Sequence, residues 1–594
     1  MTTSEARPQP ATSEIRDGMR VEWDAPIVMD DGVVLRADVF RPVSDAPVPV
    51  LLTYGPYGKG LVFSDHHAEQ WKQLVAVFPE VARDTTGSYV AWETPDPEKW
   101  VPHGYALVRV DSRGAGRSPG FLDPHSPREI HDTSLCIDWA GTQPWSNGRV
   151  GMLGISYFAC NAWLVASLAN PSPHLAAICP WEGSNDRYRE GARHGGILTT
   201  WMKHWWAARL LPLQHGYGDR GLRSPNTGEL VAGPETLSDE ELAANRVNAV
   251  AAGRGTQLEN SAARERSAVW PNVKVPFLSA GNWGGQALHL RGNVEAFVRA
   301  ASTQKWLEIH GLEHWTHFYT DYGLNLQRRF FDCFLKDDAD AWRDQPGVWL
   351  NIRRPDGSFV PRGETEWPLP DTQWTRLYLE PDGRHLTSSP ASVDNAISFA
   401  ALGDGVRFLT PPLDEEMEIT GPLVAKLFVS SSTTDADLFL VVHLIDPAGD
   451  EVTFRGAMDP RTCVGKGWLR ASHRKLDVEL TRDYRPYHSH DELQPLVPEA
   501  IYELDVEIWP TCIVVPRGYR IGLSVLGRDY IHAKHDPSAE YDNFGQRGVR
   551  NGSGGMVHDD PDDRPESVFG GTTTLHVGPD YPSSLLLPVI PARR

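Results

Sequence analysis

The sequence predicts an α/β domain with a mostly parallel sheet, interrupted by a helical insertion and followed by an all-β domain. Strand and helix patterns alternate over residues 1–186 and again over 269–345. Ala-, Leu- and Trp-rich stretches without a convincing strand fill 187–268, and residues 346–594 carry β patterning almost throughout. A chain of 594 residues is also too long for one ordinary domain. We therefore predict these three parts with these boundaries.

Short apolar runs that end in Gly-containing turns indicate the strands of the first domain. Between them lie segments with helical spacing, including "YFACNAWLVASLA" directly after residue 156. Strand–helix–strand order of this kind is typical of a parallel sheet covered by helices. The predicted strands and the first predicted helix are "APVPVLLTYGPYG" (46–58), "YALVRVDSRGAG" (105–116), the helix "REIHDTSLCIDWAGTQPW" (128–145), "GRVGMLGIS" (148–156) and "HLAAICPWEG" (174–183).

The insertion and the last domain have different patterns. The stretch "LTTWMKHWWAARLLPL" is typical of helix, and Ser238 followed by acidic residues predicts a capped helix start. Strands resume at 275–285 and 304–315, and a helix through "LNLQRRFFDCFLKD" closes the sheet domain. Farther on, runs such as "ADLFLVVHLIDPAG" alternate with Pro- and Gly-rich turns, which predicts a sandwich or jelly roll.

Composition excludes several classes of function. A formal net charge of -21 argues against nucleic acid as a partner, because a phosphate-binding face needs clustered Lys and Arg. No stretch approaches the roughly 18 apolar residues of a membrane helix, and the polar N-terminus lacks an apolar signal core, so we expect a cytoplasmic protein. The cysteines have no metal-site or disulfide spacing, and we expect neither metal nor cofactor. The six are Cys136, Cys160, Cys179, Cys333, Cys463 and Cys512.

Ser156 is the candidate nucleophile. In "RVGMLGISYFAC" (149–160) a buried strand runs into a sharp turn that presents this serine. A strand-to-helix elbow exposes the hydroxyl and brings a helix N-terminus close to it. Gly154 and Ala159 supply the small flanks of a tight elbow, but Phe158 breaks the usual G-x-S-x-G pattern. Taken alone, G-x-S is a weak motif, because such short motifs occur by chance.

The context of the serine resembles a known family. The segment "WSNGRVGMLGISYFA" resembles the nucleophile segment of the cocaine esterase-like/X-Pro dipeptidyl-peptidase superfamily. The upstream "VRVDSRGAGRSPG" (108–120) looks like that family's strand and turn before the elbow, and "RFFDCFLK" (329–336) resembles its helix after the histidine. The resemblance covers nearly the whole chain. It implies an α/β-hydrolase fold with a helical cap and a C-terminal jelly roll.

The resemblance also assigns roles to residues. It makes Ser156 the nucleophile, and it makes the hydroxyl of Tyr57, in "GPYGKG", a donor to the oxyanion. The backbone N–H of Tyr157 is the second donor. A turn tyrosine packed beside Pro56 is the structural alternative for Tyr57. The general base is expected after the last strand of the sheet, where alignment on Gly311 selects the histidine at position 314.

Three histidines compete for the role of base in "WLEIHGLEHWTH". His314 is our prediction, and His310 and His317 are the alternatives. Their spacing could also suggest zinc, for which three imidazoles are good ligands. Nothing else in the chain supplies a metal site, and the resembled family uses none.

The third member of the triad is missing from its family position. Alignment on "VPFLSAGNWGG" places Gly284 where the family has aspartate, and glycine cannot orient an imidazole. Adjacent strand ends lie close together, so we predict that Glu182, just past "LAAICPW", replaces it. Asp186, Glu313, another carboxylate and no acid at all remain alternatives. So does a Glu182 that only forms a surface salt bridge.

Aromatic residues suggest the kind of substrate. Trp201, Trp205 and Trp206 in the insertion, with Trp283, could line a roomy pocket, although core packing explains them equally well. The leading prediction is a serine esterase for a small, bulky hydrophobic or aromatic acyl substrate, acting as a monomer or a homodimer. An X-Pro dipeptidyl-peptidase or an amide hydrolase is the second. A catalytically impaired homologue that binds a ligand or carbohydrate is the third.

Overall fold

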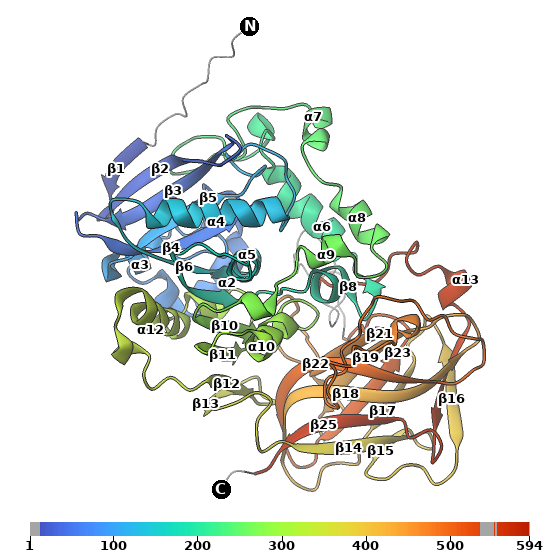
Figure 1. Cartoon of the computed structure of the whole chain (residues 1–594). Coiled ribbons are helices and arrows are strands. Elements are labelled where there is room, and N and C mark those ends of the chain that lie inside the picture. The colour runs from blue at the N-terminus through green and yellow to red at the C-terminus, as the bar shows by residue number, and fades with distance from the viewer. Residues whose placement is uncertain (1–11, 535–551, 553–554, 593–594) are drawn as a thin grey trace.

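The chain, as a computed structural model, forms an α/β domain and an all-β domain that lie side by side (Figure 1). The structure describes residues 12–534, 552 and 555–592. One sheet of 11 strands organises the first domain and one of 12 strands organises the second. In the described ranges, no helix is long and apolar enough to cross a bilayer.

The first sheet has the strand order β1-β2-β3-β5-β4-β6-β7-β10-β11-β12-β13. Its central strands, from β5 to β12 in this order, pair in parallel, and the outer ones pair antiparallel. This is the α/β-hydrolase architecture that the sequence predicts, but the sheet extends beyond the predicted boundary at residue 345, because its last two strands lie within 348–364. The strands are β1 Thr12–Arg16, β2 Met19–Val28, β3 Val34–Pro42, β4 Val48–Gly55, β5 Ala106–Asp111, β6 Ser146–Ile155, β7 Leu175–Trp181, β10 Phe277–Asn282, β11 Lys305–His310, β12 Val348–Arg353 and β13 Phe359–Glu364.

Helices cover both faces of this sheet because its central strands are apolar on both sides. Helices α4, α5 and α10 pack on one face of the sheet, and helices α2 and α12 pack on the other. Each face buries an apolar cluster of its own. The helices of this domain are α1 Phe63–His66, α2 Ala68–Val77, α3 Pro97–Trp100, α4 Pro127–Gly141, α5 Tyr157–Ala166, α10 Leu290–Arg299, α11 Thr316–Tyr319 and α12 Asp321–Lys336.

The segment 187–268 consists of short helices, as predicted, with one small departure. Two strands of two residues, β8 Arg193–His194 and β9 Ile197–Leu198, pair with each other. The helix start predicted at Ser238 is confirmed, because its hydroxyl accepts the N–H of Glu241 in a capping box. The helices are α6 Trp201–Trp205, α7 Asp239–Ala244, α8 Ala249–Gly255 and α9 Ser261–Arg264.

The all-β domain is a sheet that closes on itself, since β25 pairs with both β14 and β18. Alternating side chains of its strands fill an apolar core inside the closure. The predicted all-β character is confirmed. Its elements are β14 Gln373–Glu380, β15 His385–Thr387, β16 Asn395–Ala400, β17 Val406–Leu409, β18 Met417–Ser431, β19 Asp437–Ile445, β20 Glu451–Val452, β21 Gly465–Arg470, β22 Tyr502–Val515, β23 Arg520–Leu526, α13 Glu566–Phe569, β24 Thr572–Val577 and β25 Ser584–Ile590.

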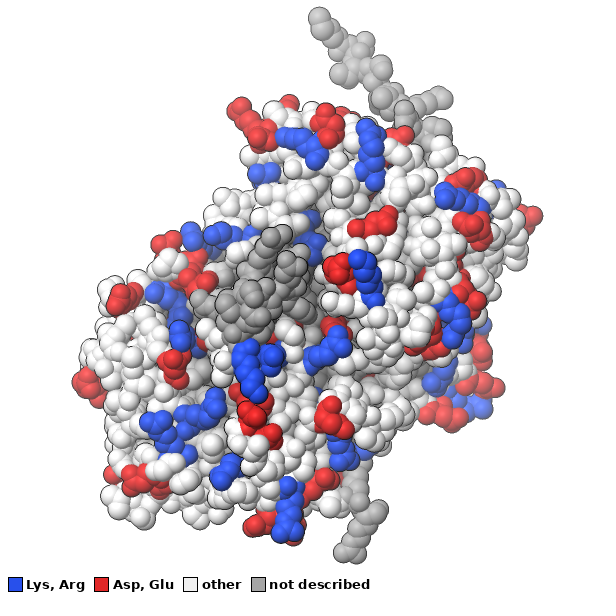
Figure 2. All heavy atoms as spheres, turned by 180° about the vertical axis from the view of Figure 1, so that it is seen from behind, with Lys and Arg blue, Asp and Glu red and all other residues white. Residues whose placement is uncertain are grey.

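The all-β domain contacts the loop that follows β10 and the first turn of α10. Gln286 Nε2 donates to the carbonyl of Pro510 at 2.9 Å, and the Arg291 guanidinium lies 3.0 Å from Glu507. These contacts fix the carboxyl ends of the sheet strands, where α/β proteins place their sites. Acidic and basic side chains are interspersed over the described residues on the face in Figure 2.

Candidate active site

Ser156 sits on the elbow between β6 and α5, as the sequence predicts. Its φ of 57° lies in the left-handed region, which costs energy for a residue with a side chain. Small neighbours make the turn possible: a Cβ on Gly154 would lie 2.5 Å from Phe158 Cβ, and one on Gly183 would lie 2.4 Å from Ala159 Cβ. The elbow turns Ser156 toward a pocket that it helps to line.

Both predicted oxyanion donors line the same pocket. Tyr157 is the first residue of α5, so its N–H has no intrahelical partner. The Tyr57 hydroxyl accepts the Nε1–H of Trp205 at 3.1 Å, which leaves its own proton free to donate. Burial, together with the nearby Glu93, raises the pKa of Tyr57 well above 10 and keeps the hydroxyl protonated. The structure therefore places both tyrosines in the lining of the pocket that contains Ser156.

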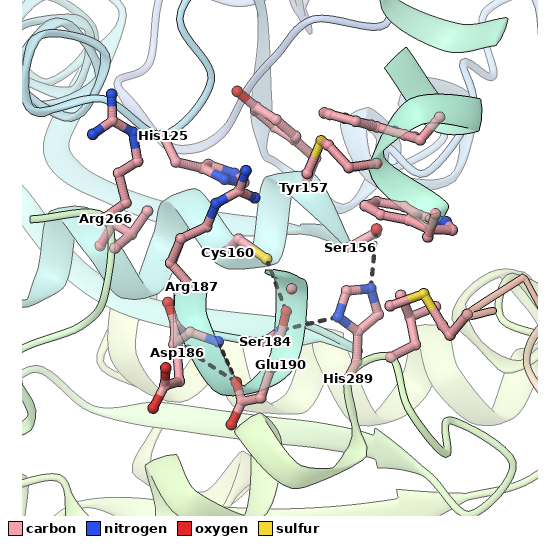
Figure 3. Close-up of a pocket in the computed structure, with 18 of the residues that line it drawn as sticks. His125, Ser156, Tyr157, Cys160, Ser184, Asp186, Arg187, Glu190, Arg266 and His289 are labelled. Atoms are coloured by element: carbon pink, nitrogen blue, oxygen red, sulfur yellow. Dashed lines mark hydrogen bonds between the residues drawn. The ribbon is translucent and has the colours of Figure 1, made fainter. Parts of the chain in front are cut away.

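A histidine that sequence reasoning missed contacts the serine. His289 lies directly before α10, and its Nε2 is 3.1 Å from Ser156 Oγ (Figure 3). Its Nδ1 accepts the backbone N–H of Ser184 at 3.0 Å. Burial and the neighbouring His314 lower the pKa of His289 well below 6.5, so the ring is neutral. A neutral ring that accepts at Nδ1 carries its proton on Nε2, so it donates to Oγ.

Glu182 and His314 are in direct contact. Glu182 follows β7 with a φ of 47°, and its fully buried Oε2 lies 2.8 Å from His314 Nδ1. Its Oε1 contacts Nε2 of His310 at 2.9 Å and accepts from Asn282 Nδ2 at 3.1 Å. Burial alone would raise the pKa of Glu182, but His314 and His310 outweigh burial and lower the pKa to about 2. The structure thus holds this carboxyl as a carboxylate that orients His314.

The other nitrogen of His314 faces Glu93, which sequence reasoning also missed. Nε2 lies 3.1 Å from Glu93 Oε1. Burial would lower the pKa of His314, but the two carboxylates raise the pKa to about 10. The rings of His314 and His289 stack, with centroids 5.4 Å apart at 22°. His314 is therefore one ring away from Ser156 and carries a proton on each nitrogen at neutral pH.

The competing histidines have other partners. Both ring nitrogens of His310 are occupied, one by Glu182 and one by Glu308 at 2.8 Å. Burial lowers the pKa of His317 to about 3, and its Nδ1 has no hydrogen-bond partner in the described part of the chain. Within the described ranges, no group of three or more His, Cys, Asp or Glu side chains is arranged to hold a metal ion.

Steric crowding explains why residue 284, where the family has aspartate, is a glycine. A Cβ on Gly284 would lie 2.3 Å from the Cα of Gly456 in the all-β domain, so no side chain fits there. The alternative acids are engaged elsewhere: Asp186 pairs with Arg189 at 2.8 Å, and Glu313 contacts Thr316 and Arg455. Neither makes a hydrogen bond or ion pair with the His314 side chain among the described residues. Glu182, which the sequence predicts as the replacement, is the carboxylate in contact with His314 Nδ1.

A pocket opens beside Ser156. Trp201 and Trp205 form one wall, stacked with ring centroids 5.2 Å apart at 14°, and Trp205 also stacks on Tyr157. Trp206 lines an adjoining cavity instead. Trp283 is not brought to this pocket: it is fully buried, and its Nε1 donates to the carbonyl of Asn351.

Comparisons with known proteins cover both domains. The family model for the X-Pro dipeptidyl-peptidase (S15 family) matches residues 31–319, and that for the X-Pro dipeptidyl-peptidase C-terminal non-catalytic domain matches 340–586. A cocaine esterase from Rhodococcus sp. (strain MB1 Bresler) is 26% identical, over 95% of this chain and 97% of its own. A putative Xaa-Pro dipeptidyl-peptidase from Bacillus anthracis is 22% identical, over 83% and 79%. The crystal structure of a CocE/NonD family hydrolase from Staphylococcus aureus is 30% identical, covers 99% of both chains and superposes with a TM-score of 0.82.

Proposed function

The chain belongs to the CocE/NonD family of serine hydrolases, which act on ester or amide bonds, and on that premise we propose that it is an esterase working through an acyl-enzyme on Ser156. The observation that carries the proposal is that Ser156, Tyr57 and Tyr157 meet in one pocket. A nucleophile on an elbow with two donors beside it is what acyl transfer requires.

In the proposed reaction, Ser156 Oγ attacks the substrate carbonyl while His314 takes the hydroxyl proton. The Tyr57 hydroxyl and the Tyr157 N–H donate to the oxygen of the tetrahedral intermediate. His314 then gives its proton to the leaving group, and a water molecule repeats the sequence on the acyl-enzyme. Glu182 accepts a hydrogen bond from the Nδ1 proton of His314 throughout, so Nε2 is the nitrogen that takes and returns the proton.

Two features of the resting site must change before this attack. His314 carries a proton on Nε2, where Glu93 contacts it, so that proton moves to Glu93, whose pKa is raised by burial. His289, the ring between, turns away from Ser156 so that Oγ can meet His314. We favour His314 over His289 as base because the Ser184 N–H fixes His289 as a donor toward Oγ.

The aromatic wall of the pocket supports a bulky hydrophobic or aromatic acyl group. An amide hydrolase or X-Pro dipeptidyl-peptidase is the second candidate, because putative dipeptidyl-peptidases are among the relatives. A protein that only binds its ligand is disfavoured, since the named relatives are hydrolases.

The test labels the purified chain with a fluorophosphonate and maps the adduct by mass spectrometry. We expect one adduct, on Ser156, that is absent from Ser156→Ala. No adduct on Ser156 in a protein that remains folded by circular dichroism would refute the proposal.

A second measurement separates the two histidines. We expect His314→Gln to lower kcat for phenyl hexanoate by about 10³-fold or more, as removal of a triad base does. We expect His289→Gln to lower kcat much less. The reverse order of effects would assign the base to His289.

A further inference from the structure

The pocket beside Ser156 contains a cation without a counter-ion. Arg187 is the first residue of the helical insertion 187–268 and lines the pocket together with Ser156 and Tyr157. Figure 3 shows its side chain extending from the Asp186 backbone toward His125 and Tyr157. Among the described residues, its guanidinium makes no hydrogen bond or ion pair; only its backbone N–H is bonded, to Ser267. An unpaired guanidinium at a partly buried site is costly and calls for an explanation.

The other charged groups of the pocket wall are already paired. Asp186 binds Arg189 at 2.8 Å and accepts two backbone N–H groups. Glu190 binds Arg291 at 2.8 Å and likewise accepts two backbone N–H groups. Both carboxylates are therefore committed to holding the backbone and their own arginines. Neither is left to neutralise Arg187.

The charged neighbour with the largest effect on Arg187 is a second cation. Arg266, which also lines the pocket, is paired with Asp123 at 2.8 Å. Burial and this second cation lower the pKa of Arg187, so the site disfavours its charge as long as no anion is present. His125 lines the same wall, and its buried Nε2 has no hydrogen-bond partner in the described part of the chain. A guanidinium and an imidazole, each with nitrogen atoms that lack a partner among the described residues, thus line one pocket.

We infer that this pocket binds a carboxylate carried by the acyl half of the substrate, with the Arg187 guanidinium as its counter-ion. The inference rests on the proposed function, because an acyl group bound to Ser156 would extend between the aromatic wall and Arg187. Guanidinium is the side chain best suited to a carboxylate, which it binds through two parallel hydrogen bonds. The substrate class is therefore an ester or amide of a dicarboxylic acid that keeps one carboxylate free.

The test compares two esters that differ only at the far end of the acyl chain. Phenyl hexanoate ends in a methyl group, and phenyl hydrogen adipate carries a carboxylate there. We define the selectivity as kcat/KM for the adipate divided by kcat/KM for the hexanoate. We expect Arg187→Gln to lower this ratio by roughly 10- to 100-fold, the value of a hydrogen bond to a charged group. Arg187→Lys should retain part of the ratio, because lysine keeps the positive charge but cannot form the two parallel hydrogen bonds of a guanidinium.

A control variant and a control ester distinguish recognition of the acyl carboxylate from other effects of removing Arg187. Arg264→Gln removes an exposed cation from α9, outside the pocket, and should leave the ratio at the wild-type value. A third ester, 3-carboxyphenyl hexanoate, places the carboxylate on the leaving group. An unchanged ratio in Arg187→Gln, or a dependence on Arg187 confined to this third ester, would overturn the inference.

A binding measurement tests the anion site when no ester is turned over. We expect adipate to bind the wild-type chain in calorimetry and to bind Arg187→Gln at least tenfold more weakly. Equal affinity in the two proteins would overturn the inference. Failure of Ser156 to react with the fluorophosphonate would instead refute the proposed function, so the two failures can be told apart.

Discussion

Replacing Glu182 by Gln tests whether the carboxylate determines the tautomer of His314. The two carboxylate oxygens have different tasks: Oε2 faces His314 Nδ1, and Oε1 faces both His310 Nε2 and Asn282 Nδ2. An amide has one oxygen and one NH2 group. Its oxygen is better placed toward the two donors, so its NH2 group turns toward Nδ1 of His314. That nitrogen must then accept, and the proton of a neutral ring moves to Nε2.

The size of the effect follows from this change of tautomer. An imidazole with its proton on Nε2 cannot take a proton from Ser156, and an acid-to-amide change of this kind in a Ser-His-Asp triad lowers kcat by about 10⁴-fold. The substitution also removes the negative charge that raises the pKa of His314. We expect Glu182→Gln to lower kcat for phenyl hexanoate by about 10³- to 10⁴-fold, with a smaller change in KM.

The assay is steady-state hydrolysis together with the rate of fluorophosphonate labelling. Both should fall, because both need an activated Ser156. Glu313→Gln is the matched control, since Glu313 precedes His314 in the chain but contacts Thr316 and Arg455. Turnover of the folded Glu182→Gln protein within tenfold of wild type would show that Glu182 does not set the tautomer of His314.

Three further predictions follow from the same contacts. Gly284→Asp, which restores the family residue, should not raise activity and should lower the free energy of unfolding in urea by about 1–3 kcal/mol, because its Cβ meets Gly456; higher activity at unchanged stability would contradict this. Tyr57→Phe should lower kcat by about 10²- to 10³-fold, measured on phenyl hexanoate, as loss of an oxyanion donor does; an unchanged kcat would remove Tyr57 from the mechanism. The raised pKa of His314, about 10 against 6.5 unfolded, contributes stability that is complete below about pH 6.5 and is lost as the pH rises toward 10. Urea unfolding of His314→Gln should therefore depend less on pH in this window, and slopes equal to wild type would contradict the prediction.

The fold was predictable because its signals are local and repeated. Each buried strand of the first sheet is an apolar run that ends in a turn, and the strand containing residues 148–156 appears as β6 Ser146–Ile155. The change to short helices and then to alternating strands also lies in the sequence itself. The hairpin of β8 and β9 was missed because strands of two residues have no readable period.

Strand order was enough to predict which residues at the strand ends lie close together in the site. Ile155 is the register partner of Trp181, and Asn282 that of His310, so the residues just past these strands meet at one edge. This places Glu182 near Ser156 without knowledge of any side chain. His289 and Glu93 were missed because they come from loops, whose paths the strand pattern does not determine. The one available signal for His289 was that it is a histidine in the loop after β10, where the family acid stands.

The all-β domain explains why residue 284, in the loop after β10, has no side chain. Its loop through Gly456 lies against Gly284, and the Ala457 N–H donates to the Gly284 carbonyl at 3.2 Å. The carbonyl of Ala457 accepts the backbone N–H of His314 at 3.1 Å. One loop therefore excludes a side chain at position 284 and fixes the backbone of the histidine. With position 284 closed, the side chain of Glu182, at the end of the neighbouring strand β7, reaches His314 Nδ1 instead. Shortening it in Glu182→Asp should therefore impair turnover although the charge is kept.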